Sequence, residues 1–170
     1  MDFTHIKYGV ALSLVAILFG GVLGLSFGCC EDFIKSSLEE QTKPVLSEKY
    51  KGDPEAAKKV VEKSWVYLKR AHFHSQTMGI ISIVFSIIIA WLGFNPKIQM
   101  GVSLLGGFGS LGYGIFWFLG ATLAPGMGST GAVKESIALV AQASGGAFFI
   151  AGVSVFTLLI HKLFVQKKSA

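Results

Sequence analysis

The sequence predicts an all-α integral membrane protein, a four-helix bundle with one extramembrane helical segment between its first and second helices. Four long stretches of the 170-residue chain carry no Asp, Glu, Lys or Arg, and they run over residues 8–30, 71–96, 98–133 and 136–161. A hydrocarbon core about 30 Å thick needs roughly 20 apolar residues at the rise of an α-helix. Each stretch reaches that length, so we expect spans at approximately residues 8–30, 71–94, 99–123 and 136–161.

The composition is typical of a single membrane domain over residues 1–170. Charged residues make up 15% of the chain, against about 25% in soluble proteins. Four spans leave no room for a soluble enzyme domain. The net charge of +5 comes from basic residues that are mixed with acids or lie near the membrane edges, where anionic headgroups attract them. We therefore expect the lipid bilayer as a partner and no nucleic acid.

The extramembrane segment is expected over residues 31–70. Asp53 is a favourable N-cap and Pro54 suits a first helical turn, and no helix breaker follows before the second span. We expect one continuous helix from Pro54 through that span, preceded by a short amphipathic helix and a turn. Three apolar side chains of the amphipathic helix are expected to lie on the membrane surface: Phe33, Ile34 and Leu38.

An even number of spans places both termini on one side of the membrane. That side carries almost only basic residues, namely Lys7, Lys97, Lys162, Lys167 and Lys168, with Asp2 as the one acid. The opposite side carries ten basic and nine acidic residues. A literal count of Lys and Arg would put the extramembrane segment in the cytoplasm. Because short, purely basic ends are the stronger determinant, we expect cytoplasmic termini in a prokaryotic inner membrane.

Three of the spans carry small residues at steps of four along one helix face. In lipid, such residues let helix backbones approach closely. The pattern predicts tight helix contacts within the bundle or between subunits, and it makes a homo-oligomer or a complex with other membrane subunits plausible. The nine positions are Gly20, Gly24 and Gly28, then Gly106, Ser110 and Gly114, then Ala143, Ala147 and Ala151.

Two histidines open the second span, and they are the main candidates for binding a cofactor. His72 and His74 lie about 200° apart around a helix and cannot both bind one ion. A neutral imidazole suits haem, a metal ion or a hydrogen bond to quinone, while an interfacial structural role is the alternative. Further metal candidates end the first span: Cys29, Cys30, Glu31 and Asp32. Their spacing matches no known metal motif.

The two cysteines are adjacent in the sequence, at positions 29 and 30. Disulfides usually join residues whose Cα atoms are about 5.5 Å apart, which is farther than chain neighbours lie. We therefore expect no bridge between them. As small side chains at the end of the first span, they have a simple structural interpretation.

The stretch from Arg70 to Gly79 resembles the histidine-bearing second helix of haem-copper oxidases and nitric oxide reductases. It is also similar to small four-span bacterial membrane proteins with a His-x-His near a glycine. The resemblance implies that His74, with Arg70 four residues before it, is a ligand of haem b. The second axial ligand would be His72 after local unwinding, a distant histidine, or a residue of another subunit.

Other catalytic motifs are missing, and a glycine-rich stretch has a structural interpretation. Residues 126–131 match G-x-G-x-x-G but follow a membrane helix, whereas a dinucleotide site requires a preceding strand. We expect a turn in which Ser129 or Thr130 caps the next helix. The sequence favours a non-enzymatic role as a structural or accessory subunit of a membrane assembly. The alternative is a redox protein that binds haem b or contacts quinone through His74 and His72.

Overall fold

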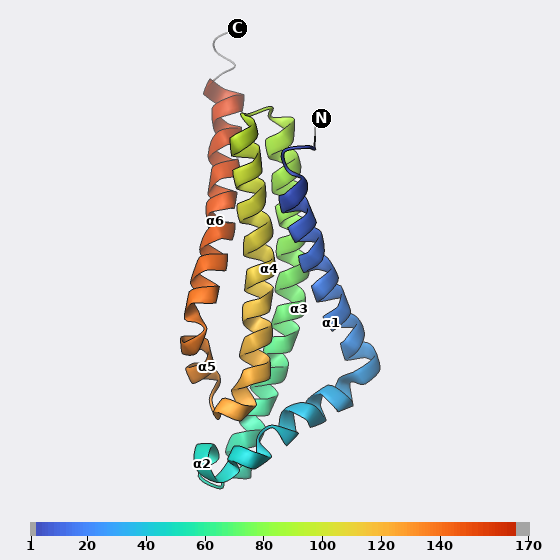
Figure 1. The fold of residues 1–170 in the computed structure, drawn as a ribbon, viewed down its shortest axis with the longest axis vertical. Coiled ribbons are helices and arrows are strands. Elements are labelled where there is room, and N and C mark those ends of the chain that lie inside the picture. The colour runs from blue at the N-terminus through green and yellow to red at the C-terminus, as the bar shows by residue number, and fades with distance from the viewer. Residues whose placement is uncertain (1–2, 166–170) are drawn as a thin grey trace.

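The computed structural model describes residues 3–165, and these residues fold as helices joined by short turns (Figure 1). Lys167 and Lys168, on which the orientation argument partly depends, lie outside the described residues. Four helices are long and apolar enough to cross a membrane, so the prediction of an all-α chain with four candidate spans is confirmed. They are α1 (Lys7–Glu40), α3 (Pro54–Trp91), α4 (Pro96–Met127) and α6 (Ala138–Ile160). The short elements are η1 (Lys43–Val45), α2 (Leu46–Tyr50), α5 (Thr130–Ser136) and η2 (His161–Val165).

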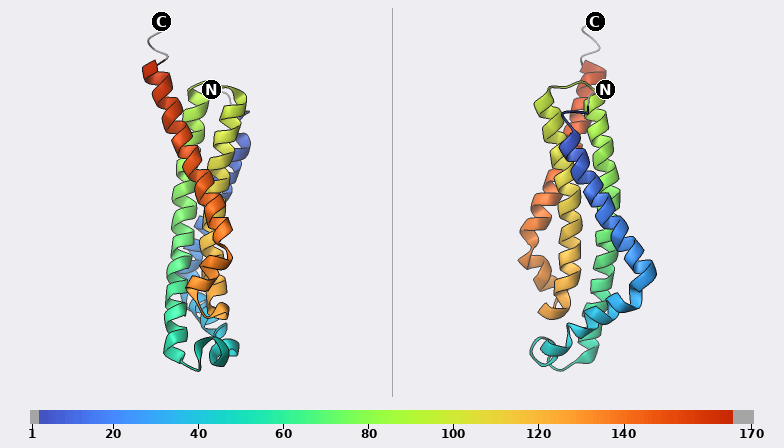
Figure 2. Two further views of the ribbon diagram at one scale, coloured as in Figure 1. Left: turned by 90° about the vertical axis from the view of Figure 1, so that its left-hand side faces the viewer. Right: turned by 45° about the vertical axis from the view of Figure 1, so that its right-hand side comes forward.

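Helices α3 and α4 run antiparallel through the middle of the bundle. Helix α1 packs across both of them, whereas α6 packs mainly on α4 (Figure 2). The start of α1, the α3–α4 turn and the end of α6 lie together at what we call the terminal end. The opposite end, which we call the bend end, holds a sharp bend in α1, the short helices α2 and α5, and the start of α3.

Helices α1 and α4 touch backbone to backbone near the terminal end. A Cβ atom added to Gly107 would lie 2.5 Å from the carbonyl oxygen of Gly9, far inside contact distance. Beside this crossing, the hydroxyl of Ser103 donates to the carbonyl of Ile6 at 3.0 Å and lies 2.8 Å from the hydroxyl of Ser86. Small side chains therefore join α1, α3 and α4 at one point.

Helix α3 carries a column of small buried residues that faces both of its neighbours. The column comprises Ser75, Gly79, Ser82 and Ser86, all buried, and their steps of four, three and four keep them on one face. Gly79 lies against Ser13 and Ile17 of α1. The sequence did not predict this column, because its steps are not all equal to four.

The small residues of α4 fit against this column of α3. Gly106 lies against Ser82, and Gly114 lies against Ser75. Ser110, between them, is buried and donates to the carbonyl of Gly107 in its own helix at 2.9 Å. This face of α4 is thus occupied within the bundle.

The small residues of α1 and α6 are only partly used inside the bundle. On α1, Gly20 and Gly24 lie against α3, whereas a Cβ on Gly28 would meet nothing within 4 Å. On α6, Ala147 and Ala151 are buried and Ala143 is exposed. The buried position next to Ala143 is Ser144, which packs against Gly109 and Gly112 of α4.

The chain between the first two spans folds back beneath the bundle. Helix α1 continues past its bend to Glu40, and Leu38 is buried with 3% of its surface exposed, while Phe33 is 77% exposed. Ile34 also packs against the core. The expectation that all three side chains lie on the membrane surface is therefore wrong for Leu38 and Ile34, because the bend turns their face toward α3.

Predicted helix starts and turns are well reproduced. The Asp53 side chain accepts from the amides of Glu55 and Ala56, and α3 runs unbroken from Pro54, so the predicted N-cap and the continuous helix are confirmed. The Ser129 side chain caps α5, as predicted. One difference is that a break at Ile137 separates α5 from α6, so the fourth candidate span begins slightly later than expected.

The α1–α4 crossing predicts opposite effects for two glycines of one helix. Gly107→Ala forces a Cβ against the backbone of Gly9, which has no flexible group to move away, and we expect a loss of about 1–3 kcal/mol of stability. Gly101→Ala is the control, because its Cβ meets nothing within 4 Å and alanine favours a helix by about 1 kcal/mol. Thermal unfolding in detergent should give a lower Tm for the first variant only; equal Tm values would contradict the close crossing.

Candidate functional site

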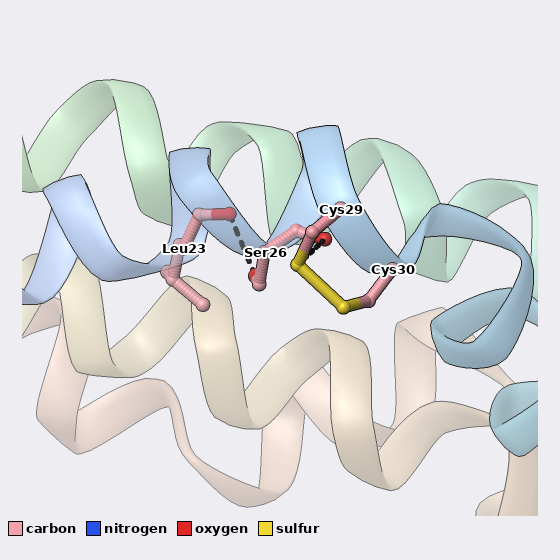
Figure 3. The surroundings of a disulfide bond; sticks show 4 residues. All are labelled: Leu23, Ser26, Cys29 and Cys30. Atoms are coloured by element: carbon pink, nitrogen blue, oxygen red, sulfur yellow. Dashed lines mark hydrogen bonds between the residues drawn. A yellow bond between two sulfur atoms is a disulfide. The ribbon is translucent and has the colours of Figure 1, made fainter.

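The most unusual local feature is the bend of α1, where the two cysteines are joined (Figure 3). Cys29 and Cys30 form a disulfide although their Cα atoms are only 3.8 Å apart, so the expectation of no bridge is wrong. Cys30 has φ −140° and ψ 26°, outside the helical region, while the residues around it are helical. In a continuous helix, neighbouring side chains diverge by about 100°. The backbone at Cys30 leaves the helical conformation, and this allows the two sulfur atoms to meet.

An apolar cavity of about 400 Å³ lies in the angle of the bend. Its walls come from α1 before the bend, from α1 after the bend, and from α3 and α4. The lining residues include Phe27, Cys30, Phe33, Ser37, Phe118 and Thr122. Cys30 thus contributes both to the disulfide and to the cavity wall. The sequence did not predict this site, because no periodic pattern marks a bend at two adjacent cysteines.

His72 points from α3 toward α1. Its Nδ1 atom is 2.7 Å from the carbonyl oxygen of Gly20, so we assign the ring proton to Nδ1. A Cβ on Gly24 would lie 2.6 Å from the Cε1 atom of this ring, so the glycine makes the space that the imidazole fills. Phe27 covers the ring edge-on at 5.8 Å between centroids. The two predicted α1 glycines therefore accommodate a histidine as well as a helix backbone.

His74 lies on another side of α3, against the aromatic side chains of α4. Its ring stacks on Trp117 with centroids 6.0 Å apart and meets the edge of Tyr113 at 5.2 Å. The guanidinium of Arg70 lies over the same Trp117 ring at 4.8 Å, a cation–π contact. In the described part of the chain, the Nε1 donor of Trp117 is buried without a hydrogen-bond partner.

The candidate ligands are not brought together at one metal centre. Within residues 3–165, no three His, Cys, Asp or Glu side chains are grouped so that they could hold a metal ion. Cys29 and Cys30 are bonded to each other, and Glu31 pairs with Lys35 on the surface. Asp32 is exposed, and the Nδ1 atom of His72 bonds to the carbonyl of Gly20, well before the cysteines in α1.

The two histidines do not fit a haem held by this chain alone. His72 and His74 leave α3 on different sides, and each ring is covered by side chains of its own bundle. A bis-histidine haem would need both imidazoles to face one flat slot. Since the helix is regular through both positions, the local unwinding that the resemblance would require is not present.

Comparisons with known proteins return no match among protein-family models, curated proteins or solved structures. The function of this chain is therefore inferred from its own geometry. Two features stand out from the packing described above. One is the bend of α1 with its disulfide and cavity, and the other is the outer face of α6.

Proposed function

We propose that this protein is a structural or accessory subunit of a membrane assembly, and that it binds its partner through the outer face of α6. The observation that carries this proposal is an exposed amide beside small residues on the least buried helix. Gln142 and Ala143 are exposed, and a Cβ on Gly146 would meet nothing within 4 Å. Phe149 and Ile150 continue the same face at 71% and 53% exposure.

Burial differs strongly between the helices. In the most apolar 18-residue stretch of α4, 44% of the residues are buried within the chain, against 11% in the corresponding stretch of α6. A glutamine amide that faces hydrocarbon lacks hydrogen-bond partners, which is unfavourable. A second helix packed on this face would supply partners for the amide, and the small residues would let it approach closely.

The other small-residue faces support the choice of α6 by elimination. Gly20, Gly24, Gly106 and Gly114 already lie against α3. Their pattern therefore has an internal explanation and needs no partner subunit. Among the predicted packing residues, Gly28 and Ala143 are the ones left free of the bundle, and only Ala143 adjoins an exposed amide side chain, that of Gln142.

Association through α6 can be tested by bulky and apolar substitutions on that face. Gly146→Leu should block close approach, and Gln142→Leu should weaken association about threefold, or about 0.6 kcal/mol, which is typical for one polar contact between membrane helices. Native gels and light scattering of the protein in mild detergent would measure complex size. Gly28→Leu is the matched control, because that glycine also has free space around it.

A single-chain particle from native membranes, with no second copy and no co-purifying subunit, would overturn the proposal. Complexes that persist unchanged in both α6 variants would show that the outer face of α6 does not bind the partner. A second copy and a different membrane subunit are distinguished by the mass of the complex.

We infer further that both termini lie in the cytoplasm of a prokaryotic inner membrane. The basic residues near the terminal end support this orientation. The disulfide at the bend end supports it independently, because disulfides persist in oxidising compartments such as the periplasm. With this orientation, the Cys29–Cys30 pair and the segment before α3 face the periplasm.

The orientation predicts the side from which an added cysteine reacts. Lys51→Cys, made together with Cys29→Ser and Cys30→Ser, places a single exposed thiol at the bend end. A membrane-impermeant maleimide should label it in intact spheroplasts, and Lys97→Cys should be labelled only after lysis. The reverse pattern would refute cytoplasmic termini.

A second candidate function is a redox protein that binds haem b or contacts quinone through His72 or His74. One observation favours it. The bond between Nδ1 of His72 and the carbonyl of Gly20 is the kind that fixes the tautomer of a ligating histidine and leaves Nε2 free. A haem would then lie between this chain and a partner, because one chain does not direct both histidines to one site.

An absorption spectrum distinguishes the two candidates. The first predicts a colourless purified protein, and the second predicts a Soret band. If haem is bound, His72→Ala or His74→Ala should abolish the band, while His161→Ala, at the terminal end, should leave it unchanged. If the protein is colourless when it is isolated with its partner subunits, haem binding by His72 or His74 is excluded.

A further inference from the structure

We propose that Cys29 and Cys30 form a redox-active pair that exchanges two electrons with a membrane quinone bound in the cavity at the bend of α1. This inference is independent of association through α6 and uses neither histidine. It rests on two observations. A disulfide joins the adjacent cysteines, and Cys30 itself lines an apolar cavity of about 400 Å³.

The disulfide lies at the surface of the protein, where a reaction partner can reach its sulfur atoms. Both cysteines are exposed, and exposed disulfides are the labile, regulatory or catalytic ones, whereas structural disulfides are resistant to reduction. A structural role is also poorly served by this bond, because it joins chain neighbours and closes no loop. A disulfide usually stabilises a protein by constraining a long loop of the unfolded chain. This bond has no such effect, because it closes no loop.

The bend links the disulfide to the cavity. Cys30 is the one residue described inside α1 with non-helical angles, and the cavity is bounded by residues on both sides of it. Phe27 comes before the bend, whereas Phe33 and Ser37 come after it. If α1 continued straight through Cys30, the later part of the helix would leave the bundle and one wall of the cavity would be lost.

The cavity has the composition expected of a site for a flat, apolar ring with polar substituents. Phe27, Phe33 and Phe118 supply aromatic surface, while Ser37 and Thr122 supply hydroxyl groups. The volume falls within the range of about 300–1,000 Å³ typical of small-molecule sites. The cavity adjoins the end of the first span, where a lipid-soluble molecule can enter from the bilayer and where the sulfur atoms lie.

The chemistry selects a quinone among the lipids that could enter. The partner of a dithiol must take up two electrons and two protons. A quinone does so, whereas an acyl chain of similar bulk accepts none. One cysteine thiolate attacks the quinone ring and forms a carbon–sulfur bond; the second thiolate attacks that sulfur, forming the disulfide and breaking the carbon–sulfur bond. The electron pair remains on the ring, and the two thiol protons end on the hydroquinone oxygens.

A single-turnover experiment on the full-length protein tests the proposal. The protein in lipid nanodiscs is reduced with a phosphine, freed of reductant and mixed with decylubiquinone. Ultraviolet absorbance measures hydroquinone, and maleimide mass-tagging counts the remaining thiols. We expect one hydroquinone formed and two thiols lost for each chain, and no reaction with Cys29→Ser or Cys30→Ser.

A matched pair of variants separates quinone binding from thiol reactivity. Thr122→Phe fills the cavity and leaves both cysteines in place. It also removes one hydroxyl group of the cavity wall, which donates to the carbonyl of Phe118 in its own helix. It should slow oxidation by decylubiquinone at least tenfold and leave oxidation by water-soluble diamide unchanged. Thr157→Phe, on the exposed face of α6, should leave both rates unchanged.

The outcomes against the proposal are equally definite. Equal quinone rates in both threonine variants would show that the cavity is not the quinone site. Diamide oxidation without quinone reduction would show a pair that exchanges only with water-soluble partners. If Thr122→Phe fails to fold, photolabelling of the wild-type protein with an azidoquinone replaces it. Label in residues 23–41, or in the lining residues Leu68, Phe118 and Thr122, supports the proposal, and label elsewhere overturns it.

Discussion

The close approach of α1, α3 and α4 at small side chains holds the bundle together. Between helices surrounded by lipid there is no hydrophobic driving force, so association depends on van der Waals contact and on interhelical hydrogen bonds. The contact of Gly107 with the backbone of Gly9, and the hydroxyls of Ser103 and Ser86 beside it, provide both.

The charge pattern was sufficient to predict four helices that are long and apolar enough to cross a membrane, because a charge-free stretch of this length is favourable only in an apolar environment. Local chemistry was equally informative at helix starts, where Asp53 and Ser129 cap the helices as predicted. These features depend on neighbours in the sequence, which a single sequence shows directly. The column formed by Ser75, Gly79, Ser82 and Ser86 was missed because alternating steps of four and three are less conspicuous than repeated glycines.

The candidate site was much less predictable than the fold. His72 and His74 were recognised, and their opposite directions follow from helix geometry, but their neighbours Gly20 and Trp117 lie far away in the sequence. The bend had no sequence signal that we could interpret. It coincides with a covalent bond between two adjacent residues, and the general expectation for such residues is that they do not bond.

The two redox hypotheses place electron transfer in different parts of the molecule. The histidines are packed between helices, where they contribute to the contacts of α3 with α1 and α4. The cysteines are exposed at the bend of α1, beside a cavity. A chain with this fold could therefore carry redox chemistry at its surface without disturbing the helix contacts on which its stability depends.

The bend of α1 also limits the thickness of bilayer that the protein can match. From Lys7 to the bend the helix is roughly 35 Å long at the α-helical rise, which is slightly more than a hydrocarbon core of about 30 Å. A straight helix of greater length could adjust to a thicker bilayer by reducing its tilt. Helix α1 lacks this freedom, because the residues after Cys30 run beneath the bundle. In a thicker membrane, the lipid around α1 would therefore have to thin before the lipid around the longer α3.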